Sequence, residues 1–426
     1  MSLDPIAGRA TLRSPLVPPL LTLGVILLLQ FAAQLFQVGL AVATDTRYAP
    51  PFPLAYMSLA HADYRILSAG NAAYLSGARD LDAVRRQARE QDDWKRKYCY
   101  PPMAYRLLAG LNLLSPQAAH FAWLGLALLA TILALVVTVR HFAGQLGSVS
   151  QGVLAITLLC LSQSTPFLFQ IERGNFDWIA LSLCLLALAS LGAKRPWAAG
   201  FLIGVAAALK VYPLLLLVIF VCVRRWRAVL AALATIGASV LILGPRDHLQ
   251  WIRFLAADRA LTFGPHPSNV SIANLLYACG ITDAVTLTRV TGIAFLALCG
   301  AFMIVLLWRG RRLPLDVVRT GLFALPYMFL VPPVHWAYTL FALLALLVVL
   351  AAVYQERPTL RLPTALLAVA IGISQSPITA PRFYPAWAPF VMPLYSITLL
   401  VIVLLSIWLV AGGAADAPRA TPVVSV

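Results

Sequence analysis

The chain has 426 residues, of which 61% are hydrophobic and only 11% are charged, and its mean hydropathy is +0.84. Soluble domains do not have this composition, so the sequence indicates a polytopic membrane protein. The formal net charge is +16, but the basic residues form short clusters between apolar runs, which argues against nucleic-acid binding. We expect no cleavable signal peptide, because the first apolar run is longer than a signal h-region.

Lysine and arginine collect between the apolar runs, and this bias orients membrane helices because cytoplasmic loops are enriched in both residues. One alternation across the membrane accommodates every cluster and places both termini on the cytoplasmic side of an inner (plasma) membrane. The clusters expected on that side are Arg9 with Arg13, Arg140, Lys194 with Arg195, Arg224 with Arg225 and Arg227, Arg309 with Arg311 and Arg312, and Arg357 with Arg361.

The expected fold is all-α, a polytopic transmembrane bundle of about 12 spans within a range of about 10 to 13, formed by one integral membrane domain over residues 1–426. Extracytoplasmic segments are expected at 43–118, with juxtamembrane helices, and at 245–284, and a disordered cytoplasmic tail at 412–426. The pieces 197–209 and 212–223 fit either a hairpin or one kinked helix, and the hairpin returns Arg224 to the inner side. The expected spans lie at about 16–42, 119–139, 152–170, 176–192, 197–209, 212–223, 227–244, 286–308, 317–332, 336–354, 362–374 and 389–411.

Most of the informative polar residues fall on the outer side of this topology. The stretch Asp80–Lys97 is mixed in charge and is typical of a solvated helix. Asp63 and Tyr64 differ, because they lie among small and apolar residues near the membrane surface. Loop acids are mostly solvated, so an ordinary loop carboxylate is the alternative to a functional role for Asp63. Tyr100 is the third residue of YCYPPMAYRLL, a segment that suits a helix lying at the interface.

The segment LFQIERGNFDWI brings Glu172, Arg173, Asn175 and Asp177 together between two apolar runs. Gly174-Asn175 is a good turn dipeptide, so we expect a tight outer turn whose charges reach water. Such a turn either binds a ligand or is simply solvated.

Lys210 is the only lysine set inside an apolar run. An ionisable group at membrane depth is costly, so a functional role is the default interpretation, and snorkelling to the interface is the alternative. Asn269 in HPSNVSIANLL and Tyr212 beside Lys210 are further polar candidates. His335 and Trp336 in VPPVHWAY fit either a site or an aromatic belt.

The six cysteines do not form a metal-ligand spacing such as CxxC. Cys160, Cys184, Cys222 and Cys299 lie in apolar runs and are expected to act as small packing residues. The other two, Cys99 and Cys279, lie on the outer side, where a disulfide between them is geometrically untested.

Several segments together resemble the GT-C superfamily of membrane glycosyltransferases, and most of all glycosyltransferase family 87. The resemblance rests on their order over roughly residues 15–345. These segments are ADYRILSAGNAAYLSG, YCYPPMAYRLL, ERGNFDWIALSLCLLAL, WAAGFLIGVAAALKVYPLLLL with RRWRAVL, NVSIANLL and VHWAY.

The resemblance implies a GT-C-like fold and an inverting transferase that takes a hexose, usually mannose, from a polyprenyl-phosphate carrier on the outer side. It implies a catalytic aspartate in the first outer segment, a role carried onto Asp63, with cationic and amide groups near the carrier phosphate. The acceptor is expected to be a lipid or a cell-envelope glycan. The residues carried onto phosphate binding are Lys210, Arg173 and Asn175.

The chemistry agrees with these residue types. An acceptor hydroxyl needs a carboxylate to take its proton, and a departing phosphate needs fixed positive charge but no strong acid. No metal ion or other cofactor is expected. Glu172 and Asp177 are expected to orient their neighbours, and the remaining candidates to line the sugar or acceptor pocket, namely Tyr64, Tyr100, Tyr212, Asn269, His335 and Trp336.

Three other functions remain open at this point. Broken helices and an intramembrane lysine also fit a transporter or flippase of lipid-linked glycans. An envelope-polymer polymerase or ligase would use the same chemistry, and a scaffold would use none. The residues carry no signal for the acceptor, the particular hexose or the oligomeric state.

Overall fold

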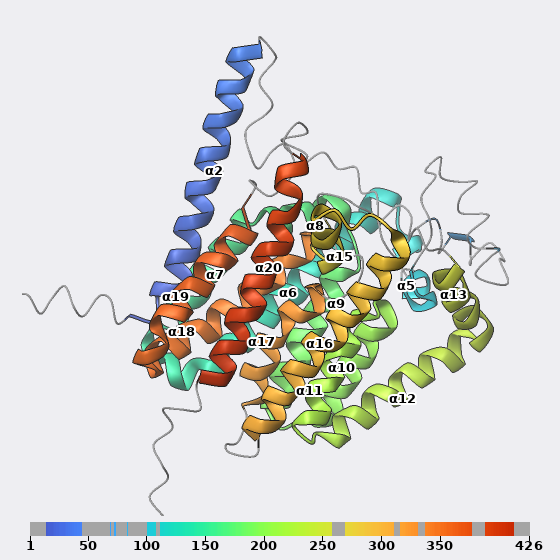
Figure 1. Ribbon diagram of the computed structural model, residues 1–426. Helices are drawn as coiled ribbons and strands as arrows, with labels where there is room; N and C mark the ends of the chain where they lie inside the picture. Colours follow the sequence, from blue (N-terminus) through green and yellow to red (C-terminus); the bar gives the residue numbers. More distant parts are fainter. Residues whose placement is uncertain are drawn as a thin grey trace, which may run out of the picture.

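The computed structural model describes residues 14–44, 69, 72–73, 83, 100–107, 111–257, 269–310, 316–330, 337–376 and 388–412. These residues form helices and turns and contain no β-strand, which confirms the all-α prediction (Figure 1). The elements that carry the argument are α2 (Val17–Thr44), α5 (Pro102–Leu107), α6 (Pro116–Leu146), α7 (Ser150–Gln163), α8 (Thr165–Arg173), α9 (Asp177–Gly192), α10 (Pro196–Leu209), η4 (Tyr212–Leu214), α11 (Leu215–Cys222), α12 (Trp226–Leu243), α13 (Pro245–Ala257), α15 (Ile272–Ala278), α16 (Ala284–Gly310), α17 (Val317–Leu330), η5 (Ala337–Ala345), α18 (Leu346–Glu356), α19 (Arg361–Ser374) and α20 (Ala388–Gly412).

Within the described residues, 5 helices are long and apolar enough to cross a membrane, by length and composition. They are Ala118–His141, Ala143–Gln163, Trp226–Leu243, Thr339–Glu356 and Pro393–Ala411. Shorter apolar helices occupy the other expected positions, at Val17–Ala33, Asp177–Gly192, Pro196–Leu209, Tyr212–Cys222, Arg289–Val305, Val317–Leu330 and Pro358–Ser374. The apolar segments therefore lie where the hydropathy pattern places them.

The expected single span over 152–170 is instead two helices, α7 and α8, separated at Ser164. The Ser164 hydroxyl accepts a hydrogen bond from the Phe167 N–H (3.1 Å), and Pro166 lies in the first turn of α8. Proline fits well in the first turn of a helix but disrupts the hydrogen bonds of a helix interior, so the chain restarts here with a serine cap instead of continuing α7. The outer segment 245–284 likewise differs from a plain loop, because it contains α13 and α15.

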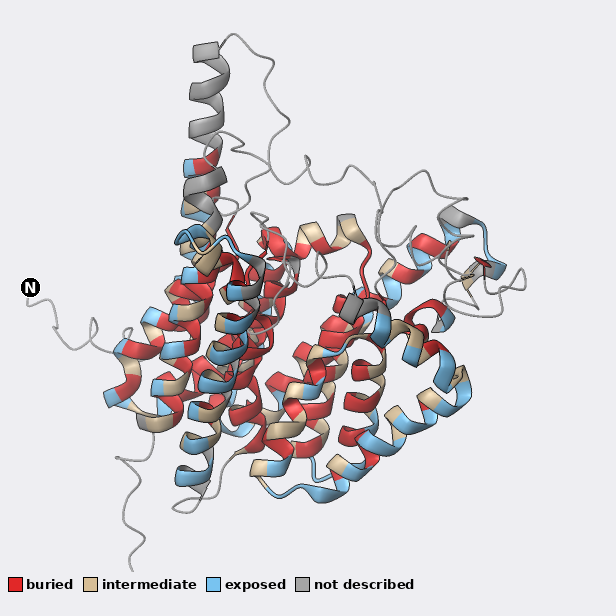
Figure 2. Ribbon diagram, turned by 45° about the vertical axis from the view of Figure 1, so that its right-hand side comes forward, coloured by how far each residue is buried: buried red, intermediate tan, exposed pale blue. Residues whose placement is uncertain are grey.

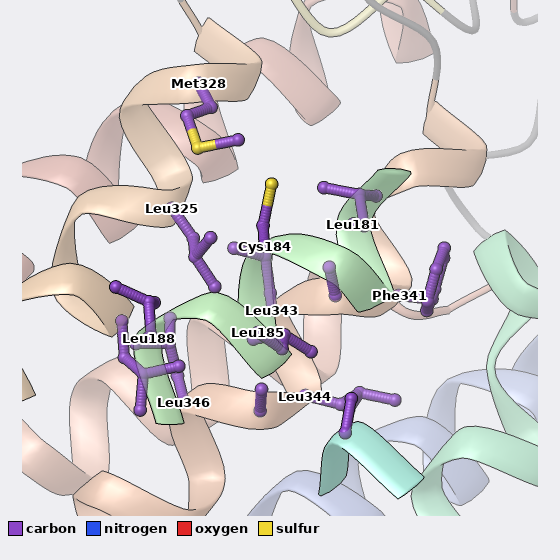
Figure 3. Packing of buried hydrophobic residues seen from close by; sticks show 14 of the residues in the cluster. Leu181, Cys184, Leu185, Leu188, Leu325, Met328, Phe341, Leu343, Leu344 and Leu346 are labelled. Atoms are coloured by element: carbon purple, nitrogen blue, oxygen red, sulfur yellow. The ribbon is translucent and has the colours of Figure 1, made fainter. Parts of the chain in front are cut away.

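The centre of the bundle is built from helices that are apolar on every side. Figure 3 shows Leu181, Cys184 and Leu188 of α9 among side chains of α17 and of the η5–α18 segment. Such helices lie in the interior, because a helix with no polar face has nothing to turn toward water. Cys184 is fully buried there, so the prediction that it packs as a small apolar residue is confirmed. By contrast, α12 is exposed along most of its length (Figure 2).

Contacts along the helices define two ends of the bundle. Three residues of α6 contact the chain from Gly174 to Gly192 in the same order. Trp123 hydrogen-bonds to the Gly174 carbonyl (3.0 Å), Thr131 hydrogen-bonds to Ser182 (3.0 Å), and His141 lies next to Gly192. Helices α6 and α9 are therefore parallel. We call the end that holds Gly174 the site end and the end that holds Gly192 the opposite end.

Helices α10 and α12 are also parallel neighbours. A Cβ on Gly200 would lie 2.1 Å from the Ala228 carbonyl oxygen, and a Cβ on Gly204 would lie 2.5 Å from the Thr235 Cβ. Because both helices start at the same level and run the same way, residues 210–225 must carry the chain back to its starting end. The observed backbone is thus a hairpin, and the alternative of one kinked helix is wrong.

Candidate functional site

A buried ion pair lies at the site end. Asp177 is the first residue of α9, Lys210 is the residue that ends α10, and their Oδ2 and Nζ atoms are 3.0 Å apart. The side chains are 4% and 19% exposed, respectively. A carboxylate at a helix N-terminus and an ammonium at a helix C-terminus each complement the partial charge of that helix end. The antiparallel packing of α9 on α10 brings these two ends together.

Tyr100, from the segment 43–118 that was predicted to lie on the outer side, covers this pair. The Lys210 ammonium lies 4.6 Å from the centroid of the Tyr100 ring, which is within the range of a cation–π contact. Tyr100 also packs edge-to-face on Tyr105 of α5, and α5 contacts α10 (Figure 1). Helix α5 packs against the bundle through buried Ala104 and Tyr105, and its expected place at the membrane interface stays a prediction.

Asn175 and Asp177 in the turn between α8 and α9 are buried, which corrects the expectation that the Asp177 charge reaches water, whereas Arg173 is partly exposed. Asn175 is 1% and Asp177 3% exposed. The Asn175 Nδ2 donates to the Tyr100 hydroxyl (3.2 Å), and its Oδ1 accepts from the Asp177 N–H (3.2 Å). The physical reason is tertiary: Tyr100 and Lys210 cover a turn that local chemistry alone leaves solvated. A simple solvated turn is thereby excluded for these residues.

Two residues that the sequence analysis missed hold this turn in place. Gln170 Nε2 donates to the Asn175 carbonyl (2.8 Å), and Trp123 Nε1 donates to the Gly174 carbonyl (3.0 Å). Gly174 adopts φ 62°, a left-handed conformation suited to glycine at the end of a helix. Gln170 was detectable as a polar residue inside an apolar run, whereas nothing local distinguishes Trp123 from other tryptophans.

Tyr212 joins the same cluster from the hairpin that follows Lys210. Its hydroxyl is buried and interacts electrostatically with Asp177, and its ring centroid lies 6.5 Å from that of Phe329. Phe329 belongs to the last turn of α17, so this helix also ends at the site end. His335 and Trp336, which follow it in the chain, lie outside the described residues.

The other candidates are distributed differently. Arg173 is the last residue of α8, with its guanidinium 5.8 Å from the Phe169 ring centroid, and the Glu172 side chain lies outside the described part of the structure. Asn269 is fully buried, and its Oδ1 accepts from the Ser271 N–H (3.1 Å) where α15 begins. Asn269 thus organises a turn in a separate element. Asp63 and Tyr64 lie outside the described residues.

No group of three or more histidine, cysteine, aspartate or glutamate side chains that could hold a metal ion occurs among the described residues. Cys279 is an exposed free thiol in the described residues, and Cys99 lies outside them, so the Cys99–Cys279 disulfide is not tested. Cys160 and Cys184 are buried as predicted.

The described residues form an all-helical bundle with several apolar helices and a buried ion pair, which is the architecture of a membrane protein, and the sequence comparisons identify its family. The profile of glycosyltransferase family 87 matches residues 98–333, more than half of the chain, and the chain belongs to that family. It is 30% identical over 198 residues to the polyprenol-phosphate-mannose-dependent alpha-(1-2)-phosphatidylinositol pentamannoside mannosyltransferase of Mycolicibacterium smegmatis. It is 30% identical over 184 residues to the enzyme of that name in Mycobacterium tuberculosis.

These matches cover 44% and 40% of this chain, and 46% and 41% of the two relatives, so the chain aligns with less than half the length of either. No solved structure matches it. The family match includes Tyr100, Asn175, Asp177 and Lys210, whereas Asp63 precedes the matched range. The buried cluster therefore lies in the part of the chain that defines the family.

Proposed function

We propose that this protein is an inverting hexosyltransferase that moves a hexose, taken to be mannose, from a polyprenyl phosphate to a lipid or envelope-glycan acceptor. The reaction takes place on the extracytoplasmic side of a cell membrane that the chain crosses about 12 times. Membership of glycosyltransferase family 87 and the names of the two relatives support the donor. The single observation that carries the proposal is the buried Asp177–Lys210 pair under Tyr100.

The pair supplies fixed positive charge for the donor phosphate. An ammonium has three N–H donors; one is used by Asp177 and another faces the Tyr100 ring, which leaves one for a phosphate oxygen. Asp177 holds the Lys210 side chain in place, so little reorganisation is needed when negative charge develops on the leaving phosphate. Asn175 fixes the N-terminus of α9 and Tyr100 relative to each other. Arg173 at the end of α8 adds a second cation.

The transfer itself is assigned to Asp63, which stays a prediction. Its carboxylate takes the proton of the acceptor hydroxyl, and the acceptor oxygen forms a bond to the anomeric carbon of the hexose. The bond from that carbon to the phosphate oxygen breaks, and its electron pair leaves with the phosphate. Attack from the opposite face inverts the anomeric centre, by analogy with glycoside hydrolysis. The chemistry requires no metal ion, so chelators should leave the rate unchanged.

The test uses purified full-length protein in liposomes with polyprenyl-phosphate-mannose and candidate lipid acceptors. We expect transfer by wild type, and a loss of at least about 100-fold for Asp63→Asn, because general-base catalysis contributes roughly 100- to 10,000-fold. Transfer by Asp63→Asn at the wild-type rate would assign the base elsewhere. Movement of the mannolipid across the bilayer without any transfer would favour the flippase alternative.

Sidedness is tested separately. Single cysteines at positions 63 and 173, in a background without the native cysteines, should react with an impermeant maleimide from the outside of intact cells. Labelling only after the inner face is exposed would reverse the proposed topology.

A further inference from the structure

The turns that begin α10 and α12 have the same backbone conformation. Lys194 (φ 60°) and Arg224 (φ 57°) are left-handed and are the only such non-glycine residues in the described part of the chain. In both turns the next residue donates its N–H to the carbonyl five positions earlier, from Arg195 to Ser190 (2.9 Å) and from Arg225 to Phe220 (2.8 Å). The same turn conformation, with two basic residues in each turn, therefore occurs before both helices.

The packing of α10 on α12 places these turns side by side. The two helices are parallel and in register, because Gly200, four residues after the start of α10, faces Ala228 near the start of α12. Their starting ends consequently form one surface at the opposite end of the bundle (Figure 1). We call it the basic–aromatic patch, and it consists of Lys194, Arg195, Trp197, Arg224, Arg225, Trp226 and Arg227.

The cations of this patch have no acidic partner among the residues that the structure describes. None of its lysine and arginine side chains forms an ion pair within the described residues, whereas Arg319 at the same end is paired with Glu356. The two tryptophans, Trp197 and Trp226, are 57% and 55% exposed. Exposed tryptophan next to basic residues is typical of the headgroup level of a bilayer.

An exposed apolar face continues from the patch along the same two helices. Phe201, Leu230 and Leu233 are 56%, 58% and 54% exposed, and only 17% of the apolar window of α12 is buried. Cations at one end of these two helices and exposed apolar side chains farther along them correspond to the two parts of an amphiphilic molecule. Its acidic head would contact the arginines, and its acyl chains would lie along α10 and α12.

We propose that the basic–aromatic patch binds an anionic phospholipid through its phosphate headgroup. Arginine suits this ligand because its planar guanidinium donates two parallel hydrogen bonds to a phosphate. The enrichment of positive charge in cytoplasmic loops explains why cations occur at this end. It does not explain why two turns of the same conformation lie side by side and form one cluster of cations without acidic partners among the described residues. Helix α10 separates the patch from Lys210 by about 20 Å, so this site is distinct from the transfer site and independent of the proposed function.

The test is native mass spectrometry of the full-length protein in neutral detergent, titrated with phosphatidylglycerol, phosphatidylcholine or free glycerol phosphate. The variant is Arg224→Gln/Arg225→Gln/Arg227→Gln, with Arg224→Lys/Arg225→Lys/Arg227→Lys as the charge-preserving partner. The matched control is Arg140→Gln/Arg357→Gln, which removes basic residues from the same end but outside the patch.

We expect wild type to retain phosphatidylglycerol in preference to phosphatidylcholine and not to retain glycerol phosphate. The glutamine variant should lose at least about tenfold in retained phosphatidylglycerol, because each basic residue at an anionic surface contributes roughly fivefold. The lysine variant should keep most of the binding, and the control should match wild type. Equal retention by wild type and the glutamine variant, an equal loss in the control, or retention of glycerol phosphate alone would each overturn the lipid site.

Discussion

Charged side chains cluster at both ends of this bundle, but the two clusters differ in burial and in ion pairing. At the site end, Asp177 and Lys210 are withdrawn from water and paired with each other. At the opposite end, the cations of the basic–aromatic patch are exposed and unpaired within the described chain, and the Arg319–Glu356 pair is partly exposed. Exposed charges have little effect on the free energy of unfolding, whereas removing one partner of a buried ion pair lowers it strongly. The same residue types therefore mark a site at one end and a surface at the other.

The largest expected effect comes from breaking the buried pair. Asp177→Asn or Lys210→Met should each lower the free energy of unfolding by about 3–5 kcal/mol, because either leaves one charge buried without a partner. The double variant should cost less than the sum of the two, since no lone charge remains. Thermal midpoints and mannose transfer are measured together, with exposed Arg140→Gln as the control. Additive losses in the double variant would show that the two residues do not act as a pair.

Close helix packing should give the next largest effect. A Cβ on Gly200 would lie 2.1 Å from the Ala228 carbonyl oxygen, a backbone atom that cannot turn aside. We expect Gly200→Ala to cost about 1–3 kcal/mol by overpacking. Gly237→Ala in α12 is the matched control, because its Cβ meets nothing within 4 Å, and it should be neutral or stabilising. A thermal midpoint of Gly200→Ala equal to that of the control would contradict the parallel α10–α12 contact.

A smaller effect is expected from the ion pair at the opposite end. The Arg319 Nη2 and Glu356 Oε2 atoms are 2.9 Å apart, with side chains 23% and 30% exposed. Arg319→Gln should lower stability by no more than about 1 kcal/mol, and raised salt should reduce the difference further. The thermal midpoint is followed at low and high salt. If Arg319→Gln lowered the thermal midpoint as much as Lys210→Met does, the two ion pairs would not differ in their contribution to stability.

The smallest effect should be a pH dependence at Asp316. Burial alone would raise the pKa of this carboxyl, but a hydrogen bond from His141, the Arg319 backbone N–H and the charges of both residues lower it below its ordinary 3.8. A lowered folded pKa means that Asp316 stabilises the fold above that ordinary value and that this contribution is lost as the pH falls through the folded pKa.

The difference in thermal midpoint between wild type and Asp316→Asn should therefore be present near pH 6 and shrink in acid. The same difference at every pH would show that the interaction does not depend on the ionised carboxylate. Asp316 also accepts the N–H of Val318 (2.9 Å), so part of the effect is that of a helix cap.

Hydropathy and positive charge predicted most of the helices. The apolar runs, and the arginines between them, placed α12, α16 and α20 within a few residues of their observed bounds, while α6 continues to Leu146, beyond the expected end at 139. The break at Ser164 was missed because the apolar run continues on both sides of it. Hydropathy alone therefore does not separate the end of α7 from the serine-capped start of α8. The helices α13 and α15 were missed because an amphipathic segment outside the span carries no uniform apolar signal.

The site was predicted in part. Lys210 stood out because an ionisable residue in an apolar run is rare, and Asn175 and Asp177 because they interrupt another run. Their partnership was not predictable, since 33 positions separate Asp177 from Lys210 in the chain and only the packing of α9 on α10 joins them. Trp123 and Gln170 carried no recognisable role until their hydrogen bonds to the turn were known.

By itself, the sequence determined the apolar helices, the membrane class, the family and the residue types from which a site is built. These properties follow from amino-acid composition, the spacing of apolar residues and the order of short motifs, all of which can be read from segments of the sequence one at a time. Only the tertiary structure decided which charges are buried, that Tyr100 closes over Lys210, and that two basic turns meet at the far end. The reason is physical: burial and pairing depend on distances between segments remote in sequence, and helix packing alone sets those distances.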